Sequence, residues 1–240
     1  MKLVGERRAL SAVIFAFYFL VYLIIGLQSL VPDLDKAFYA LAFVYGLAFF
    51  SLVAGYFWAR WYAVGVGLYG VITTAIGMWQ LGPEPILLFV GGTHLGATLM
   101  LWGHAMSEPY DGQTAWREKF HMDDHAVQRL GRSVIRAGVS LPMVLLYAFA
   151  PKPGSAETAV AGVALVLAAF GLRALVRLRT WGVLALGAAG GLLLTMATID
   201  ASAHSTLFVL RPALAGALLV SAATPWLRPA LAFVGLRRGV

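Results

Sequence analysis

The first apolar run of the chain, ALSAVIFAFYFLVYLIIGLQSL at residues 9–30, contains no charged residue. A helix of this length, at about 1.5 Å per residue, crosses a hydrocarbon core about 30 Å thick. Lys2, Arg7 and Arg8 precede the run, as they would in a secretory signal. The run is longer than the apolar region of a signal and lacks a small-residue cleavage pattern at its end. We therefore expect a retained membrane-spanning helix.

Seven further apolar runs follow the first one along the chain. The eight runs lie approximately at residues 9–30, 37–58, 61–81, 85–105, 134–150, 158–178, 181–201 and 206–224. Sixty per cent of the 240 residues are apolar, 12 per cent are charged, and the mean hydropathy is +0.81. These values exclude a soluble globular domain. The sequence predicts an all-α integral membrane protein with about eight transmembrane helices.

The basic residues gather between alternate runs. If the N-terminus is inside, 15 of the 18 Lys and Arg residues lie on the cytoplasmic side, and only Lys36, Lys152 and Arg211 lie outside. Because cationic side chains are retained on the cytoplasmic face, we expect both termini in the cytoplasm, in a bacterial inner membrane. The net charge of +7 is then explained by topology and by anionic lipid headgroups as partners. Nucleic acid is not an expected partner.

The two halves of the sequence resemble each other weakly. Shifting the chain by 120 residues aligns residues 47–100 with 167–220 without gaps and gives twelve identical pairs. This is about twice the number that the composition alone would produce. Trp61 and Trp181 open equivalent spans. Two parallel four-helix repeats are therefore our hypothesis, with a shared Ala/Leu/Gly-rich composition as the alternative.

The predicted domains are a first four-helix half at residues 1–106, a cytoplasmic amphipathic interfacial segment at 107–133, and a second four-helix half at 134–240. In and just after the middle segment, the apolar side chains fall on one stripe of a helical wheel: Trp116, Phe120, Val127, Leu130 and Val134. Such a segment lies at headgroup depth. We expect contacts with lipid headgroups from Trp116, Arg117, Arg129, Arg132 and Arg136.

Two histidines in this segment, His121 and His125, have the spacing of metal ligands on one helical face, and Asp124 lies beside them. The pair lies opposite the apolar stripe and has no clear third ligand. A solvated face is therefore the favoured interpretation, and a metal site at His121, Asp124 and His125 is the weaker alternative.

Ionisable residues within or beside the spans are the best indicators of function, because hydrocarbon disfavours them unless they are paired or hydrated. By depth and by the repeat alignment, five of them gather toward the outer side: Glu84, His94, Asp200, His204 and Arg211. They form a candidate polar vestibule that binds an anionic group or relays a proton. The structural alternative is that His94 hydrogen-bonds to a neighbouring helix and Arg211 pairs with Asp200.

Glycine pairs four residues apart suggest where helices touch. Gly92 with Gly96, and Gly187 with Gly191, form small-xxx-small pairs that allow close backbone approach in lipid. We expect both pairs to make helix contacts.

Several chemistries are not expected. The chain has no cysteine, and it lacks the sequence motifs of serine hydrolases, P-loop proteins, zinc proteases and dinucleotide-binding folds. Histidines at or within the ends of a span, His94 and His104, occur only in the fourth one, which does not suit paired haem ligands. We therefore predict no cofactor.

Two functional hypotheses remain, and the sequence does not decide whether the chain is an enzyme. The favoured one is a non-enzymatic role, either as a small transporter-like element or as a membrane subunit that associates with other subunits or with copies of itself. The alternative is a membrane-embedded enzyme that acts on a lipid or isoprenoid through a His/Asp site. The scarcity of catalytic residue types favours the first hypothesis.

Overall fold

The computed structural model describes residues 3–106, 124–152, 154–177, 179, 181–200 and 206–237, and these residues form helices joined by short connections. The α-helices are α1 (Val4–Leu27), α2 (Asp35–Ala54), α3 (Ala59–Leu81), α4 (Pro85–Leu101), α6 (Asp124–Phe149), α7 (Ser155–Val176), α8 (Trp181–Asp200) and α9 (Thr206–Arg237). Two short 3₁₀ turns, η1 (Pro32–Leu34) and η2 (His104–Met106), flank α2 and α4. Each of the eight expected spans therefore has its helix.

Six of these helices are long and apolar enough to cross a membrane: α1, α2 with η1, α3, α6 from His125, α7 and α8 to Ile199. Shorter apolar stretches lie in α4 and at Pro212–Trp226 of α9. Large apolar side chains such as Phe43, Phe50 and Leu184 are exposed along the helices. Water disfavours such a surface and lipid accommodates it, so the fold fits a multi-pass membrane protein.

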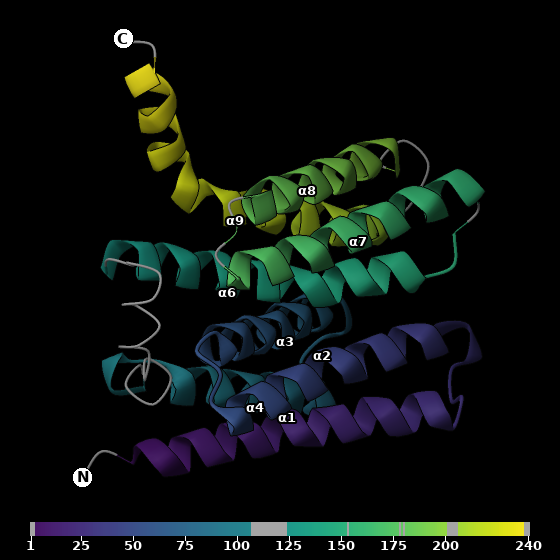
Figure 1. Cartoon of the computed structure of the whole chain (residues 1–240). Helices are drawn as coiled ribbons and strands as arrows, with labels where there is room; N and C mark the ends of the chain where they lie inside the picture. The colour runs from purple at the N-terminus through teal and green to yellow at the C-terminus, as the bar shows by residue number, and fades with distance from the viewer. Residues whose placement is uncertain are drawn as a thin grey trace.

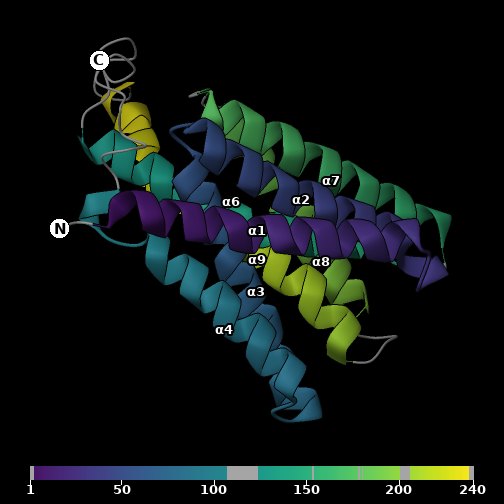
Figure 2. The same cartoon turned by 90° about the horizontal axis from the view of Figure 1, so that it is seen from below.

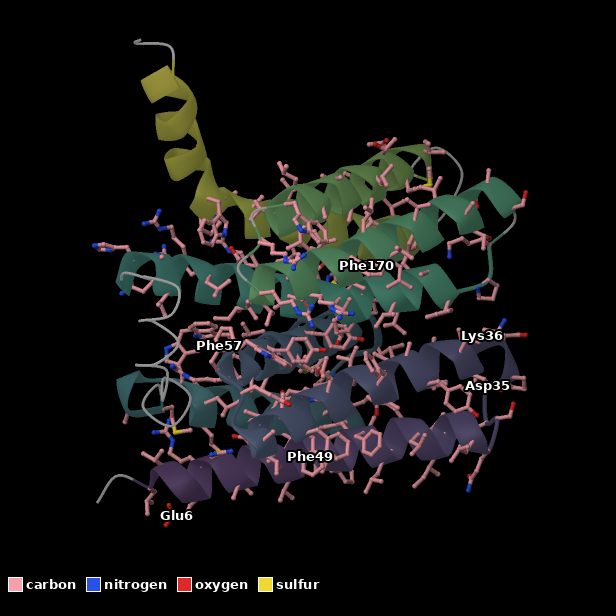
Figure 3. The ribbon with its side chains drawn as sticks, viewed as in Figure 1. Glu6, Asp35, Lys36, Phe49, Phe57 and Phe170 are labelled. Carbon is pink, nitrogen blue, oxygen red and sulfur yellow. The ribbon has the colours of Figure 1, made fainter. Side chains whose placement is uncertain are left out.

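Aromatic residues mark the two ends of α3. Trp58 is the N-cap residue of the helix, and Trp79, which is 77% exposed, lies near its other end. The two positions are 21 apart, which corresponds to about 32 Å of helix, close to the thickness of a hydrocarbon core. Figure 3 shows Glu6 and Phe57 at one end of the molecule and Asp35 and Lys36 at the other. Tryptophans at both ends are typical of membrane–water interfaces.

The connections end the helices through proline and glycine. Gly55 follows α2 with φ of 73°, a left-handed conformation that side chains with a Cβ disfavour. Pro85 opens α4 at a position where the missing N–H has no helical partner to lose. These tight turns make consecutive helices antiparallel, so the start of α1 and the end of α9 lie at the same end of the molecule (Figure 1).

The helices form two groups of four, α1–α4 and α6–α9, which Figure 1 shows as a lower and an upper layer. In each group, every helix contacts the next, and the fourth contacts the first. The start of α7 follows that of α2 by 120 residues, the shift used in the sequence alignment. An origin by duplication stays a hypothesis.

The two groups meet where α6 packs on α3 and α2. A Cβ built on Gly65 of α3 would lie 2.6 Å from the carbonyl oxygen of Ile135 and 3.0 Å from the Cα of Gly138, both on α6. A Cβ on Gly131 of α6 would lie 2.7 Å from the Trp61 ring. The two backbones therefore touch, and side chains larger than hydrogen do not fit between them.

The structure corrects two expectations about packing. Neither Gly92 with Gly96 nor Gly187 with Gly191 makes the expected helix contact, because a Cβ at any of the four would meet no atom within 4 Å. The contacts are made by other glycines, including Gly65, Gly67 and Gly70. Small-xxx-small spacing is common in a glycine-rich chain and does not show which face of a helix is covered.

The second correction concerns the segment before the fifth span. Residues 124–133 and the fifth span form one helix, α6, and the predicted division into domains stays a prediction. The apolar side chains of Val127, Leu130 and Val134 are buried in the protein instead of facing headgroups. Figure 2 shows α6 passing behind α1 and α2, in the interior of the molecule. An amphipathic stripe alone does not distinguish a lipid surface from a protein core.

The seam between α3 and α6 is testable by adding one methyl group. We expect Gly65→Ala to lower the free energy of unfolding by roughly 1–3 kcal/mol, because the added Cβ overlaps rigid backbone atoms. Thermal unfolding of the purified protein in detergent measures the effect. Gly92→Ala is the matched control, since its Cβ enters open space. Equal melting temperatures for the two variants would contradict the described seam.

Candidate functional site

His94 lies in the middle of α4 and is 1% exposed. Its Nδ1 is 2.7 Å from the carbonyl oxygen of Val90, one turn earlier in the same helix. A carbonyl oxygen only accepts hydrogen bonds, so Nδ1 carries a proton. Nε2 is 2.7 Å from the hydroxyl oxygen of Tyr45 on α2. In the neutral imidazole Nε2 is the acceptor, so the Tyr45 hydroxyl donates to it.

The ring of His94 is enclosed by three other helices. The centroid of the Tyr18 ring, on α1, is 4.2 Å from that of His94, and the Tyr45 ring is edge-on at 5.7 Å. On the α3 side, a Cβ built on Gly70 would lie 1.9 Å from His94 Cδ2. Glycine at position 70 therefore makes the space that the imidazole fills.

Two more hydroxyl side chains complete this cluster. The Tyr18 hydroxyl is 2.6 Å from Oγ1 of Thr93, and Thr93 donates to carbonyls of its own helix, so Tyr18 is the donor between them. The side chains of Tyr22 and Tyr45 interact, with ring centroids 5.2 Å apart. We call Tyr18, Tyr22, Tyr45, Thr93 and His94 the His94 cluster. It links α1, α2 and α4 at mid-span.

Sequence reasoning identified His94 but missed its partners. Tyr18 and Tyr45 lie well inside apolar runs, whereas tyrosines of membrane proteins are enriched at the interfaces. This unusual position could have identified them as partners of a buried polar group. A hydroxyl at mid-span needs a partner, and the histidine provides one.

The other vestibule residues are not brought to His94 by any described contact. Glu84 is the exposed N-cap residue of α4. Asp200 ends α8 and Arg211 lies in α9, but their side chains, like the whole of His204, lie outside the described part of the chain. The five-residue vestibule therefore stays a prediction. At the same end, Asp35 accepts a hydrogen bond from Ser29 at 2.5 Å through Oδ2, while its Oδ1 is buried without a partner.

Arginines from α1 and α3 bind carbonyl oxygens at the ends of α2 and α4. Arg8 donates to Leu52 and Val53 at 2.6–2.9 Å. Arg7 donates to Leu99 and Trp102, and Arg60 to Leu101 and Gly103, at 2.7–3.2 Å. The last carbonyls of a helix lack N–H partners and carry partial negative charge, so cationic donors are favoured there. These arginines are part of the fold.

Arg136, a predicted headgroup contact, has partners within the protein. Its Nη1 donates to the carbonyl oxygen of Ser221 at 2.5 Å and to Oγ1 of Thr224 at 2.6 Å. In an uninterrupted helix the Ser221 carbonyl would accept from the N–H of residue 225, but that residue is Pro225. The guanidinium and the Thr224 hydroxyl, which is 2.7 Å from this oxygen, donate to it in place of the missing N–H. Figure 1 shows α9 bending away from the bundle beyond this region.

The structure describes only some of the other residues that were predicted to contact lipid headgroups or a metal ion. Arg132 is exposed and donates to Gln128, and Arg129 donates to His125, each within α6. Trp116, Arg117 and His121 lie outside the described residues, as does the side chain of Asp124, while His125 is exposed. Within the part of the chain that was searched, no three His, Cys, Asp or Glu residues come together as metal ligands. Both the headgroup contacts and the metal site stay predictions.

The helices and the buried polar cluster fit the class of multi-pass α-helical membrane proteins. Comparison of the chain with protein-family models, curated proteins and solved structures finds no match. Any statement about function therefore depends on the geometry of the described residues.

The role of Arg136 is testable by a double-mutant cycle with Pro225. Arg136→Gln should lower the free energy of unfolding by roughly 1–3 kcal/mol, because the Ser221 carbonyl loses its charged donor and keeps only the Thr224 hydroxyl. In the Pro225→Ala background the backbone N–H is restored, so the same change should cost about half as much or less. Arg132→Gln is the control and should change stability by less than about 0.5 kcal/mol. Equal costs in both backgrounds would contradict the replacement of the missing donor.

Proposed function

We propose that this protein is a small transporter-like element of a bacterial inner membrane, which moves an ion or small polar solute without transforming it, through a site at His94. The support is one observation: an ionisable side chain at mid-span, buried, with hydrogen bonds to both ring nitrogens. Ionisable groups are disfavoured in a membrane interior and usually have a function there. Transporters commonly bind their substrates near the bilayer midplane.

The second half of the chain supports a functional reading of the cluster. At the 120-residue shift, Tyr18 corresponds to Gly138, Tyr45 to Leu165 and His94 to Leu214. The second group of four helices packs in the same cyclic order with these apolar residues. Among its described residues, the buried polar side chains are Ser133 and Ser140 of α6, which donate to carbonyls of α9. An ionisable side chain is therefore present at the aligned positions of the first group and absent from those of the second.

The enzymatic alternative has less support at this position. Acid–base catalysis on a lipid or isoprenoid needs at least two titratable groups placed around a reacting atom. The described partners of His94 are a tyrosine hydroxyl and a carbonyl oxygen, with no carboxylate among them. Asp200 would have to supply that group.

A role as a membrane subunit is a second candidate, favoured by a specific feature of α4. Gly92 and Gly96 lie one turn apart with open space above both. Lipid-facing small residues of this spacing suit close approach by a helix of another subunit or a second copy. This role is compatible with transport.

Transport is tested with the protein reconstituted in liposomes on a solid-supported membrane. The applied probes are Na⁺, K⁺, phosphate and amino acids, each in a concentration jump. We expect a transient current for at least one probe, reduced about tenfold or more in His94→Asn, which loses one or two buried hydrogen bonds. Thr98→Ser is the control, because Thr98 is buried on the same helix and bonds to its own backbone. Identical currents for wild type and His94→Asn would overturn the proposal.

The proposed orientation of the chain in the membrane is tested by cysteine labelling. Only the introduced cysteine can react, because the chain has no cysteine of its own. Tyr56 and Leu30 are both exposed at turns, on opposite ends of the bundle. In intact cells, Leu30→Cys should react with a membrane-impermeant maleimide, and Tyr56→Cys should react only after lysis. The reverse pattern would place both termini outside.

A further inference from the structure

The two ring nitrogens of His94 differ in whether they can gain and lose a proton. Nδ1 donates to Val90 within the same helix, so this proton is held in place. Nε2 faces the hydroxyl of Tyr45 on another helix. A hydroxyl both donates and accepts, so it can hydrogen-bond to Nε2 whether or not that nitrogen carries a proton. Nε2 is therefore the nitrogen at which a proton can be gained and lost.

The Tyr45 hydroxyl connects in turn toward one end of the bundle. Tyr22, which interacts with Tyr45, is half-buried and lies five residues before the end of α1, about 8 Å from it along the helix. Its ring stacks on Phe38, in the first turn of α2, with centroids 6.2 Å apart. The order His94, Tyr45, Tyr22 thus runs from mid-span to the end that our topology places outside.

One feature of the surroundings of His94 favours a cation and acts against the cost of burying a charge. The Tyr18 ring approaches the imidazole to 4.2 Å, and aromatic ring faces attract positive charge. The titratable groups that face the imidazole are Tyr18 from α1 and Tyr45 from α2, with Tyr69 of α3 behind Tyr45. From α3 itself the nearest residue is Gly70. No described contact of His94 involves a charged side chain.

We infer that the ion bound at His94 is a proton, which reaches and leaves Nε2 through the hydroxyls of Tyr45 and Tyr22. This inference depends on the proposed transport function and names its ion. In the loading step the Tyr45 O–H bond breaks as the Nε2–H bond forms, and Tyr45 regains a proton from the Tyr22 hydroxyl. Tyr22 regains one from a hydronium ion at the outer end, which becomes water. The sum is one proton moved from hydronium to Nε2, which gives an imidazolium at position 94, and unloading reverses each step.

The inference is tested by ¹⁵N NMR of ¹⁵N-histidine-labelled protein in lipid nanodiscs. The chain has five histidines, and the His94 signals are those absent from the spectrum of His94→Asn. At pH 8 we expect protonated Nδ1 and unprotonated Nε2. Between pH 8 and 5 we expect the Nε2 acceptor signal to be lost as the second proton binds. A His94 that keeps an unprotonated Nε2 throughout this range would overturn the inference.

The relay is tested by the rate of proton exchange at Nε2, read from line broadening. Tyr45→Phe and Tyr22→Phe should each slow the exchange at least about tenfold, because a positioned proton-transfer group is removed. Tyr62→Phe is the matched control, since Tyr62 is also buried but its hydroxyl faces the Val44 carbonyl. Unchanged exchange in Tyr45→Phe would overturn the route.

The outcomes separate the inference from the function on which it depends. If His94 fails to bind the second proton while His94→Asn still abolishes the current of another probe, the transport proposal stands and the proton is excluded. If His94 titrates and exchanges through Tyr45 but no probe or pH jump produces a current, the proton site stands and the transport proposal fails.

Discussion

A polar group in hydrocarbon must find its hydrogen-bond partner within the protein, and this constraint explains most of the molecule. Helices satisfy their own backbones except at their last turns and at prolines. Arg7, Arg8 and Arg60 donate hydrogen bonds to carbonyls at the ends of α2 and α4. Arg136 donates to the Ser221 carbonyl near Pro225. The basic residues that mark the proposed cytoplasmic side thus also complete the secondary structure.

The same constraint explains the polar contacts in the interior of the first four helices. His94 and Tyr45 satisfy each other there, and Tyr18 is satisfied by Thr93. At the 120-residue shift of the repeat hypothesis, the aligned residues are Gly138, Leu165 and Leu214, and the two leucines are only partly buried. These aligned positions carry no ionisable side chain, and the buried polar side chains described in α6 are Ser133 and Ser140. The burial of an ionisable side chain at mid-span is the observation that supports a function for the site.

The sequence predicted the approximate positions of the eight α-helices in the described part of the chain, because run length and apolar composition are set directly by bilayer thickness. Six of them are long and apolar enough to cross a membrane. The sequence also identified His94. It did not predict that Gly65 and Gly70 would be the packed glycines while Gly92 and Gly96 face open space, or that Leu130 and Val134 would face protein. Those facts depend on which neighbour covers each helix face, and periodicity within one helix carries no information about its neighbours.

The contact between Gly70 and His94 has a consequence for evolution. Because a Cβ at position 70 would occupy the place of the imidazole, the two positions cannot vary independently. In a homologous chain, a larger residue at the first site requires a smaller one at the second, and retention of the histidine requires glycine. A glycine on the third helix followed 24 positions later by a histidine on the fourth is therefore a covariation signature with which distant relatives can be recognised.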